Sequence, residues 1–206
     1  MRVLGRASSL NVRKVLWTLD EIGISYHRED WGAGFRSTGE PAFLALNPNG
    51  LVPVIEDENG TLWESNAICR YLAAKAGRGD LFPADPFRRA RVDQWMDWQA
   101  TELNGAWSYA FLALVRENPA YQDPARIAAS LAEWDRMMEI LDDHLAENGP
   151  YLLGEDFTLA DIVIGLSVHR WRMTPHAMPD LGEVLGYYER LCERPDFLTH
   201  GPNGFA

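Results

Sequence analysis

The sequence predicts a chain of two domains, a mixed α/β domain followed by an all-helical one. Three observations predict this division. Short apolar runs alternate with helical patterns over residues 1–78, a polar stretch with two prolines follows at 80–86, and no convincing strand pattern appears after it. A length of 206 residues suits two small domains. We therefore expect one domain at 1–78 and an all-helical domain at 86–206.

The first 78 residues contain the pattern of a βαβαββα unit. Asn59-Gly60 lies between two strand-like runs and is a strong signal for a β-hairpin. Ser65 is a favourable cap for the helix that follows. Asn47-Pro48-Asn49-Gly50 ends the preceding helix, because proline and glycine do not continue one. The expected elements are strand 3–4, helix 12–22, strand 24–26, helix 41–46, strands 52–57 and 61–64, and a helix from 65 that stops near Gly77.

Four helices are expected in the second domain. Apolar residues recur at helical spacing over about 86–117, and Asp123-Pro124 begins a second amphipathic helix that Gly149-Pro150 ends. Thr158 and Asp161 fit a capping box, with aspartate in place of the usual glutamate, for a nearly apolar helix that should be central and buried. The last clear helix covers 181–193, and the residues after 196 are unassigned.

Composition and charge point to a small-molecule ligand. A formal net charge of -11 argues against a nucleic-acid partner. Residues 1–6 lack the apolar core of a signal peptide and no stretch is long enough to span a bilayer, so we interpret the chain as soluble and cytoplasmic, with no membrane partner. Cys69 and Cys192 have no C-x-x-C spacing and are expected to be buried packing residues. The histidines show no ligand spacing, and no metal is expected.

The order of these motifs resembles the cytosolic glutathione transferase family, over nearly the whole chain. The resemblance is carried by the βαβαββα order, Asn47-Pro48-x-Gly50-x-Val52-Pro53, Glu64-Ser65 at a helix start, and Thr158-x-x-Asp161 in an all-helical domain. It implies a thioredoxin-like first domain that binds glutathione as co-substrate, a homodimer and a role in detoxification. A serine-type, theta- or nu-like bacterial member is indicated, because no tyrosine lies near the end of the first strand and no cysteine at 8–11.

The resemblance also implies where glutathione binds. Val52 should offer its N–H and C=O to the cysteinyl part of the ligand, with Pro53 in the cis form, whereas most prolines are trans. Glu64 and Ser65 should hold the two ends of the γ-glutamyl group, since a helix N-terminus presents N–H groups and positive potential to a carboxylate. Arg36 is the basic residue of 32–41 and a candidate for the glycyl carboxylate. A plain helix cap at Ser65 and a solvated charge at Arg36 are the alternatives.

The catalytic candidates lie where the first helix begins. An unperturbed cysteine thiol has a pKa of ~8.5. Lowering that pKa by about two units requires about 2.7 kcal/mol of preferential stabilisation of the thiolate. Matching Lys14-Val15 to the basic-apolar pair of the family makes Ser9 the first candidate for the hydroxyl that donates to the thiolate. Asn11 is the second, because its amide is a competent donor. Ser8 replaces either if the register is shifted, and all three could be helix caps.

The electrophile and the reaction type are less constrained. The resemblance implies an apolar site for a small hydrophobic electrophile. Trp107 and Phe111 are favoured to line it over Trp98, Tyr109 and Trp171, although aromatic residues at helical spacing usually belong to a core. A glutathione-dependent isomerase or peroxidase would use the same thiolate. The fold could also serve a non-catalytic ligand carrier or regulatory protein, whereas a thioredoxin-like oxidoreductase would need a reactive cysteine in the first domain.

Overall fold

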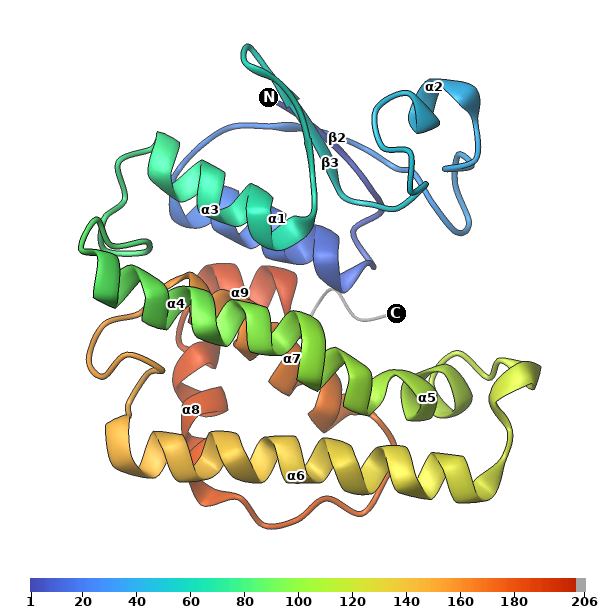
Figure 1. Cartoon of the computed structure of the whole chain (residues 1–206), viewed down its shortest axis with the longest axis vertical. Coiled ribbons are helices and arrows are strands. Elements are labelled where there is room, and N and C mark those ends of the chain that lie inside the picture. The colour runs from blue at the N-terminus through green and yellow to red at the C-terminus, as the bar shows by residue number, and fades with distance from the viewer. Residues whose placement is uncertain (203–206) are drawn as a thin grey trace. The chain divides into compact units, whose positions relative to one another are not determined.

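The computed structural model describes residues 1–202 and confirms the fold class, a mixed α/β unit and a helical unit (Figure 1). The chain separates into two compact units. The first comprises Met1–Ala84 together with the segment that begins at Arg194, and the second comprises Asp85–Glu193. Each unit is described below by itself.

The first unit is built on a four-stranded mixed sheet in the order β2-β1-β3-β4. β1 pairs with β2 in parallel and with β3 in antiparallel orientation, and β3 and β4 form an antiparallel hairpin. Helices α1 and α3 contact each other (Figure 1), and their apolar faces are buried. The elements are β1 (Arg2–Leu4), α1 (Leu10–Glu21), β2 (His27–Glu29), α2 (Pro41–Leu44), β3 (Val54–Asp57), β4 (Gly60–Trp63) and α3 (Ser65–Lys75).

The second strand begins three residues later than its apolar run predicts. The reason is the end of α1, which closes through backbone bonds from Gly23 to Asp20 and from Ile24 to Leu19. Gly23 has a φ of 69°, a left-handed conformation that glycine adopts without steric cost. The apolar residue at 24 therefore completes the helix cap, and the strand pairs through the polar run His27–Glu29.

In the second unit, the predicted long helix is divided in two by a π-helical turn, Gln99–Leu103. Four more helical segments follow, and α5 contacts α6 (Figure 1). The prediction that the helix after Thr158 is central is confirmed, since every residue from Leu159 to His169 is buried. The segments are α4 (Pro86–Trp98), α5 (Asn104–Leu114), a 3-10 turn (Pro119–Tyr121), α6 (Pro124–Asn148), α7 (Leu159–Met173) and α8 (Gly182–Cys192).

A ninth α-helix, α9 (Pro195–His200), lies in the stretch left unassigned, and it packs on α1 of the first unit. Phe197 meets Trp17 with ring centroids 5.1 Å apart, and both side chains are fully buried. By its contacts α9 groups with the mixed unit, although it follows the helical one in sequence.

The cysteines differ from each other in burial. Cys69 is fully buried as expected, and burial raises the pKa of its thiol to about 11. Cys192, in the last turn of α8, is only partly buried, so the expectation that both cysteines are buried is wrong for Cys192. Among residues 1–202, no helix is both long and apolar enough to cross a membrane. Within the same range, no three potential ligands of the His, Cys, Asp or Glu type are arranged to hold a metal ion.

Candidate functional site at one edge of the sheet

The strand register brings the predicted glutathione-binding segments to one edge of the sheet. Leu4 at the end of β1 pairs with Val54 at the start of β3, and Val54 pairs with Trp63 at the end of β4. Neighbouring strands lie about 4.8 Å apart. The loop after β1, the residues before β3 and the residues after β4 therefore share this edge, which carries Ser9, Asn11, Val52, Pro53, Glu64 and Ser65.

Ser9 is the N-cap residue of α1, with an extended backbone at φ -79° and ψ 123°. Its carbonyl accepts the Arg13 N–H at 3.0 Å, but its hydroxyl makes no capping bond. The side chain is half-buried, as is that of Ser8, whereas Asn11 in the first turn is exposed. The Ser9 hydroxyl is thus available at the positive end of the α1 dipole, where a thiolate would be favoured.

The Val52–Pro53 peptide bond is cis, as the sequence analysis predicted. Within residues 1–202, neither the N–H nor the C=O of Val52 has a hydrogen-bond partner. The chain passes close to Gly5, whose φ is 153°: a Cβ there would lie 3.1 Å from Val52 Cβ and 2.5 Å from Val12 Cγ2. Glycine at this position therefore lets the start of α1 approach a peptide group that can pair with an extended ligand.

Glu64 and Ser65 form the start of α3. Glu64 is exposed and has a φ of 73° and a ψ of 108°, a left-handed conformation that side chains other than glycine adopt at a cost. Ser65 is 5% exposed, and its hydroxyl has no partner among residues 1–202. The N–H groups of the first helical turn have no intrahelical acceptor. This end of α3 can therefore bind a carboxylate, with the Glu64 carboxylate beside it for an ammonium group.

The two arginines near this edge differ in their partners. Arg36, the sequence candidate, pairs with Glu40 at 3.0 Å, and its guanidinium carbon lies 3.8 Å from the centroid of the Trp31 ring. The Arg6 side chain has no hydrogen bond or ion pair within residues 1–202. Its Nη1 atom lies 3.4 Å from where a Cβ on Gly32 would stand. No sequence motif singles out Arg6, although its place in the loop between the first strand and Ser9 could have indicated it.

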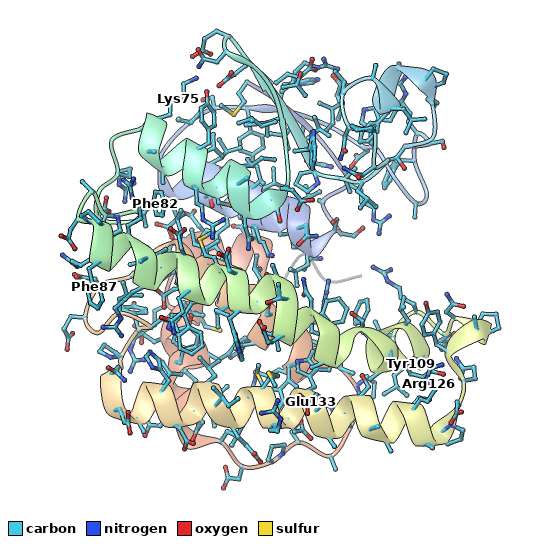
Figure 2. The ribbon with its side chains drawn as sticks, in the orientation of Figure 1. Lys75, Phe82, Phe87, Tyr109, Arg126 and Glu133 are labelled. Carbon is cyan, nitrogen blue, oxygen red and sulfur yellow. The ribbon has the colours of Figure 1, made fainter. Side chains whose placement is uncertain are left out.

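The aromatic candidates all lie in the second unit, in two kinds of surroundings. Trp107 and Phe111 form an edge-to-face pair with ring centroids 5.3 Å apart. The other three are engaged elsewhere, since Trp98 packs on Trp95, Tyr109 on Arg126 and Tyr121, and the Trp171 indole N–H donates to Asp135 at 2.8 Å. Figure 2 shows Tyr109 and Arg126 close together between α5 and α6.

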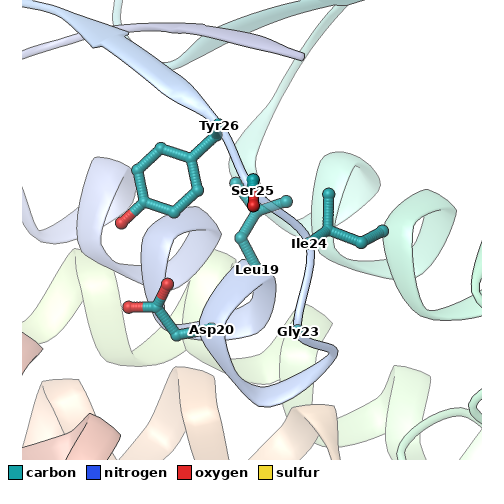
Figure 3. Close-up of a pocket in the computed structure, with 6 residues that line it drawn as sticks. All are labelled: Leu19, Asp20, Gly23, Ile24, Ser25 and Tyr26. Carbon is teal, nitrogen blue, oxygen red and sulfur yellow. The ribbon is translucent and has the colours of Figure 1, made fainter.

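An open surface pocket in the first unit contains none of the predicted site residues. It lies at the C-terminal end of α1 and is lined by Leu19, Asp20, Gly23, Ile24, Ser25 and Tyr26 (Figure 3). Burial and the neighbouring Asp20 carboxylate raise the pKa of the Tyr26 hydroxyl. This pocket is at the opposite end of α1 from Ser9, about 18 Å away for a 12-residue helix. It is therefore separate from the sheet-edge site.

Known proteins match both units. A family model for the glutathione S-transferase N-terminal domain matches residues 8–75, and one for the C-terminal domain matches 124–190. Over 193 residues, the chain is 38% identical to the glutathione S-transferase GstB of Escherichia coli K12. This alignment covers 93% of the chain and 92% of GstB. The chain is also 32% identical over 167 residues to elongation factor 1-gamma 2 of Oryza sativa subsp. japonica. That alignment covers 78% of this chain but only 38% of the elongation factor.

A solved structure with the same fold contains glutathione. The theta class glutathione S-transferase of Xanthomonas axonopodis pv. citri, crystallised with glutathione bound, superimposes with a TM-score of 0.91 at 39% identity. The match covers 98% of this chain and 96% of the other. The family models, the identity to GstB and this likeness show that the chain belongs to the glutathione S-transferase family.

Proposed function

We propose that this chain binds glutathione at the sheet edge, stabilises its thiolate through Ser9 and transfers it to a small hydrophobic electrophile. The observation that carries the proposal is the convergence on that edge of unengaged polar groups: the Ser9 hydroxyl, the Val52 peptide group and the Ser65 hydroxyl. A charge-assisted hydrogen bond from a hydroxyl contributes roughly 1.5 to 3 kcal/mol. That range covers much of the stabilisation that the thiolate needs, and the α1 dipole adds to it. Asn11 is the second candidate donor.

The remaining recognition follows from the chemistry of the tripeptide. Val52 pairs with the cysteinyl peptide group, and Ser65 with the first turn of α3 receives the α-carboxylate while Glu64 meets the amino group. Arg36 remains a candidate for the glycyl carboxylate. Arg6 is a second candidate, supported by its lack of a partner within residues 1–202. Trp107 and Phe111 line the site of the electrophile.

A non-catalytic role is the second candidate function. It is favoured by one observation, the similarity to elongation factor 1-gamma proteins, although the chain spans only 38% of the length of the rice relative. Against it stand the unengaged polar groups at the sheet edge, which a purely structural domain does not need. Isomerisation or peroxide reduction with the same thiolate would differ only in the second substrate.

Three further proposals rest on family membership: a homodimer, a cytoplasmic location and a role in detoxification. The division into a glutathione-binding domain at 1–78 and a helical domain at 86–206 is proposed as the functional one. Mass in solution tests the dimer, because a homodimer has twice the mass of the 23.3 kDa chain.

The experiment is the ultraviolet absorbance of the glutathione thiolate against pH, with binding measured separately by calorimetry. The wild type should lower the thiol pKa of bound glutathione. Ser9→Ala should return that pKa most of the way to the value of free glutathione, and Asn11→Ala should change it less. Tight binding with an unshifted thiol would instead support the non-catalytic role. A larger effect of Asn11→Ala would assign the donor to Asn11.

A further inference from the structure

A buried arginine links the loop that carries Ser9 to the end of α9. We call residues 6–9 the Ser9 loop. The Arg13 side chain leaves α1 near its N-terminus and is 4% exposed. Its Nε atom donates to the Ala7 carbonyl at 2.9 Å, and its Nη1 atom donates to the Gly201 carbonyl at 3.4 Å. One guanidinium within the first unit therefore contacts both the Ser9 loop and the residue that ends α9.

The Ser9 loop has few backbone bonds of its own. The Ser9 N–H closes its turn by donating to the Arg6 carbonyl at 3.1 Å, and the Arg6 N–H donates to the Trp31 carbonyl at 3.1 Å. In the described part of the chain, the Ala7 carbonyl accepts no bond other than that from Arg13. Removing the guanidinium would therefore leave the middle of the loop unsupported, two residues before the hydroxyl that the proposed function uses.

The other end of the link depends on a glycine. Gly201 is the C-cap residue of α9, and its N–H donates to the Phe197 carbonyl at 2.6 Å. A Cβ on Gly201 would lie 2.8 Å from that carbonyl oxygen and 2.9 Å from Cε2 of the Phe197 ring. These separations are too short for a real side chain, so any larger residue would have to shift the turn. The turn can thus present the Gly201 carbonyl to Arg13 because no side chain stands there.

The stability of α1 by itself does not explain the position of Arg13. A cation near the N-terminus of a helix opposes the helix dipole, which favours anions at that end. Burying a guanidinium is also costly unless its N–H groups are hydrogen-bonded. Its planar group holds these donors in a fixed geometry, so two carbonyls that it bonds are held in a fixed relation to each other. Such a group suits a residue that positions a loop.

We infer that Arg13 is a positioning residue: it holds the Ser9 hydroxyl in place for the thiolate and makes that position depend on the docking of α9. This inference rests on the proposed function and adds a residue that acts through Ser9 rather than on the ligand. Groups of a functional site must be held within about 0.5 Å of their productive position. Loosening the Ser9 loop should therefore weaken stabilisation of the thiolate, whereas Val52 and Ser65, on other segments, should still bind the tripeptide.

The first test is the thiol pKa of glutathione bound to Arg13→Met, measured by thiolate absorbance against pH. That pKa should rise by about one unit relative to the wild type, the effect of losing most of one hydrogen bond. Calorimetry at about pH 5, where the thiol is protonated, should show an affinity for glutathione within about twofold of the wild type. An unchanged thiol pKa in the folded variant would overturn the inference.

A double variant shows whether Arg13 acts through Ser9. If it does, Ser9→Ala combined with Arg13→Met should have the same thiol pKa as Ser9→Ala alone. Independent effects would add, so additive shifts would overturn the inference. Arg13→Lys should recover part of the shift, because an ammonium keeps the charge but lacks the planar fork that reaches two carbonyls.

Arg190→Met is the matched control. The Arg190 guanidinium also donates to a backbone carbonyl, that of Pro150 at 2.9 Å, but it does so within the second unit. Its replacement should reduce stability and leave the thiol pKa unchanged. The same rise of pKa as in Arg13→Met would show a general effect of destabilisation and would overturn the inference.

Gly201→Ala tests the end of the link at α9. Its methyl group should displace the Gly201 carbonyl, so the thiol pKa should rise as in Arg13→Met. The rise should be smaller, because the bond from Arg13 to Ala7 remains. An unchanged pKa would overturn the dependence on α9. Gly201→Ala keeps Arg13 in place and also tests the inference if Arg13→Met does not fold.

Hydrogen exchange separates this inference from the proposed function. If the wild type leaves the thiol pKa of bound glutathione unshifted, the proposed function fails, but exchange of the Ser9 amide can be measured without a ligand. Exchange should be roughly tenfold faster in Arg13→Met than in the wild type, because the loop that holds this amide opens more often. Arg190→Met should leave the rate unchanged. Equal rates in Arg13→Met and the wild type would overturn the positioning role.

Discussion

The carboxylate of Asp161 accepts hydrogen bonds from both the backbone N–H and the hydroxyl of Thr158, at 2.8 and 3.1 Å, through a single oxygen. Its other oxygen accepts the Leu152 N–H at 3.0 Å and the Tyr187 hydroxyl at 3.2 Å. Asp161 is fully buried. One side chain therefore joins the start of α7 to the preceding loop and to α8.

The first prediction concerns replacement of this carboxylate. Asp161→Asn should lower the free energy of unfolding by about 2 to 4 kcal/mol, because an amide NH₂ would face donors that the carboxylate accepts. Asp142→Asn is the control: Asp142 is half-buried and accepts a single backbone bond, from Val184 at 2.8 Å. It should cost less than about 1 kcal/mol. Urea unfolding measures both, and equal losses would contradict the account.

The second prediction is a pH dependence of stability. Burial raises the pKa of Asp161 to about 6, against the opposing effect of its four donors. An aspartate in the unfolded chain ionises near pH ~3.9. Between these values the folded state holds a proton that the unfolded state has released, so stability falls as pH rises from about 4 to about 6. The contribution is about 3 kcal/mol for two pKa units.

Denaturant unfolding at pH steps across this window measures the effect. Asp161→Asn does not titrate and should lose the downward slope. Asp57 affects stability in the opposite direction and at lower pH. Hydrogen bonds from Lys75 and Tyr71 lower its pKa to about 2, so its contribution to stability is lost as pH falls below about 4. An unchanged slope in Asp161→Asn would assign the pH dependence to other groups.

The third prediction separates backbone strain from ligand binding at Glu64. Glu64→Gly and Glu64→Ala both remove the carboxylate, so both should weaken glutathione binding by the same factor in calorimetry. Glycine tolerates the φ of 73°, whereas alanine does not. Allowing for the entropy of glycine, the Gly variant should be more stable than the Ala variant by about 1 kcal/mol. Equal stability would show that this conformation is not strained.

The fourth prediction decides between Arg6 and Arg36. Glutathione esterified at its glycyl carboxylate lacks the charge that either arginine would bind. If Arg6 binds it, Arg6→Met should weaken binding of glutathione roughly tenfold and leave binding of the ester unchanged. Arg36→Met should have a small effect on both ligands, because Arg36 already pairs with Glu40. The reverse pattern would assign the carboxylate to Arg36.

The fifth prediction concerns α9. Phe197→Ala should lower the free energy of unfolding by about 3 to 5 kcal/mol, because it leaves a cavity beside the buried Trp17 ring. Leu198→Ala on the same helix is the control. Leu198 is 40% exposed, so its truncation should cost much less. Similar losses for the two variants would contradict the packing described for α9.

The sequence predicts the fold well where local signals agree with tertiary packing. Asn59-Gly60 gives the β3–β4 hairpin, and Thr158-x-x-Asp161 gives a buried helix with a capping box. It fails where one residue type has two roles. Pro195 follows the predicted helix 181–193 and is typical of a helix end, but it is also the first residue of α9, because proline fits the first helical turn as well as the position after a helix.

The π-helical turn could not be predicted, since the apolar periodicity continues through Gln99–Leu103 with no proline or glycine to mark a break. The site was predictable in part. The motifs predicted a ligand-pairing peptide group at Val52 and a helix start at Ser65, and the strand register brings both to one edge of the sheet. The sequence does not show which of Arg6 and Arg36 is available to bind a carboxylate. That depends on the ion pair of Arg36 with Glu40, and many acidic residues could have formed such a pair.

The packing of α9 on α1 makes the first unit discontinuous along the chain. Besides the Phe197 contact, Arg194 forms a two-pronged pair with Glu21 at 2.8 and 2.9 Å, and His200 meets Asp20 at 2.5 Å. During synthesis, α1 leaves the ribosome long before these partners exist. Its Trp17 ring can pack on α9 only after residues about 180 positions later have been made. The mixed unit can therefore reach its full packing only after the entire helical unit has been made.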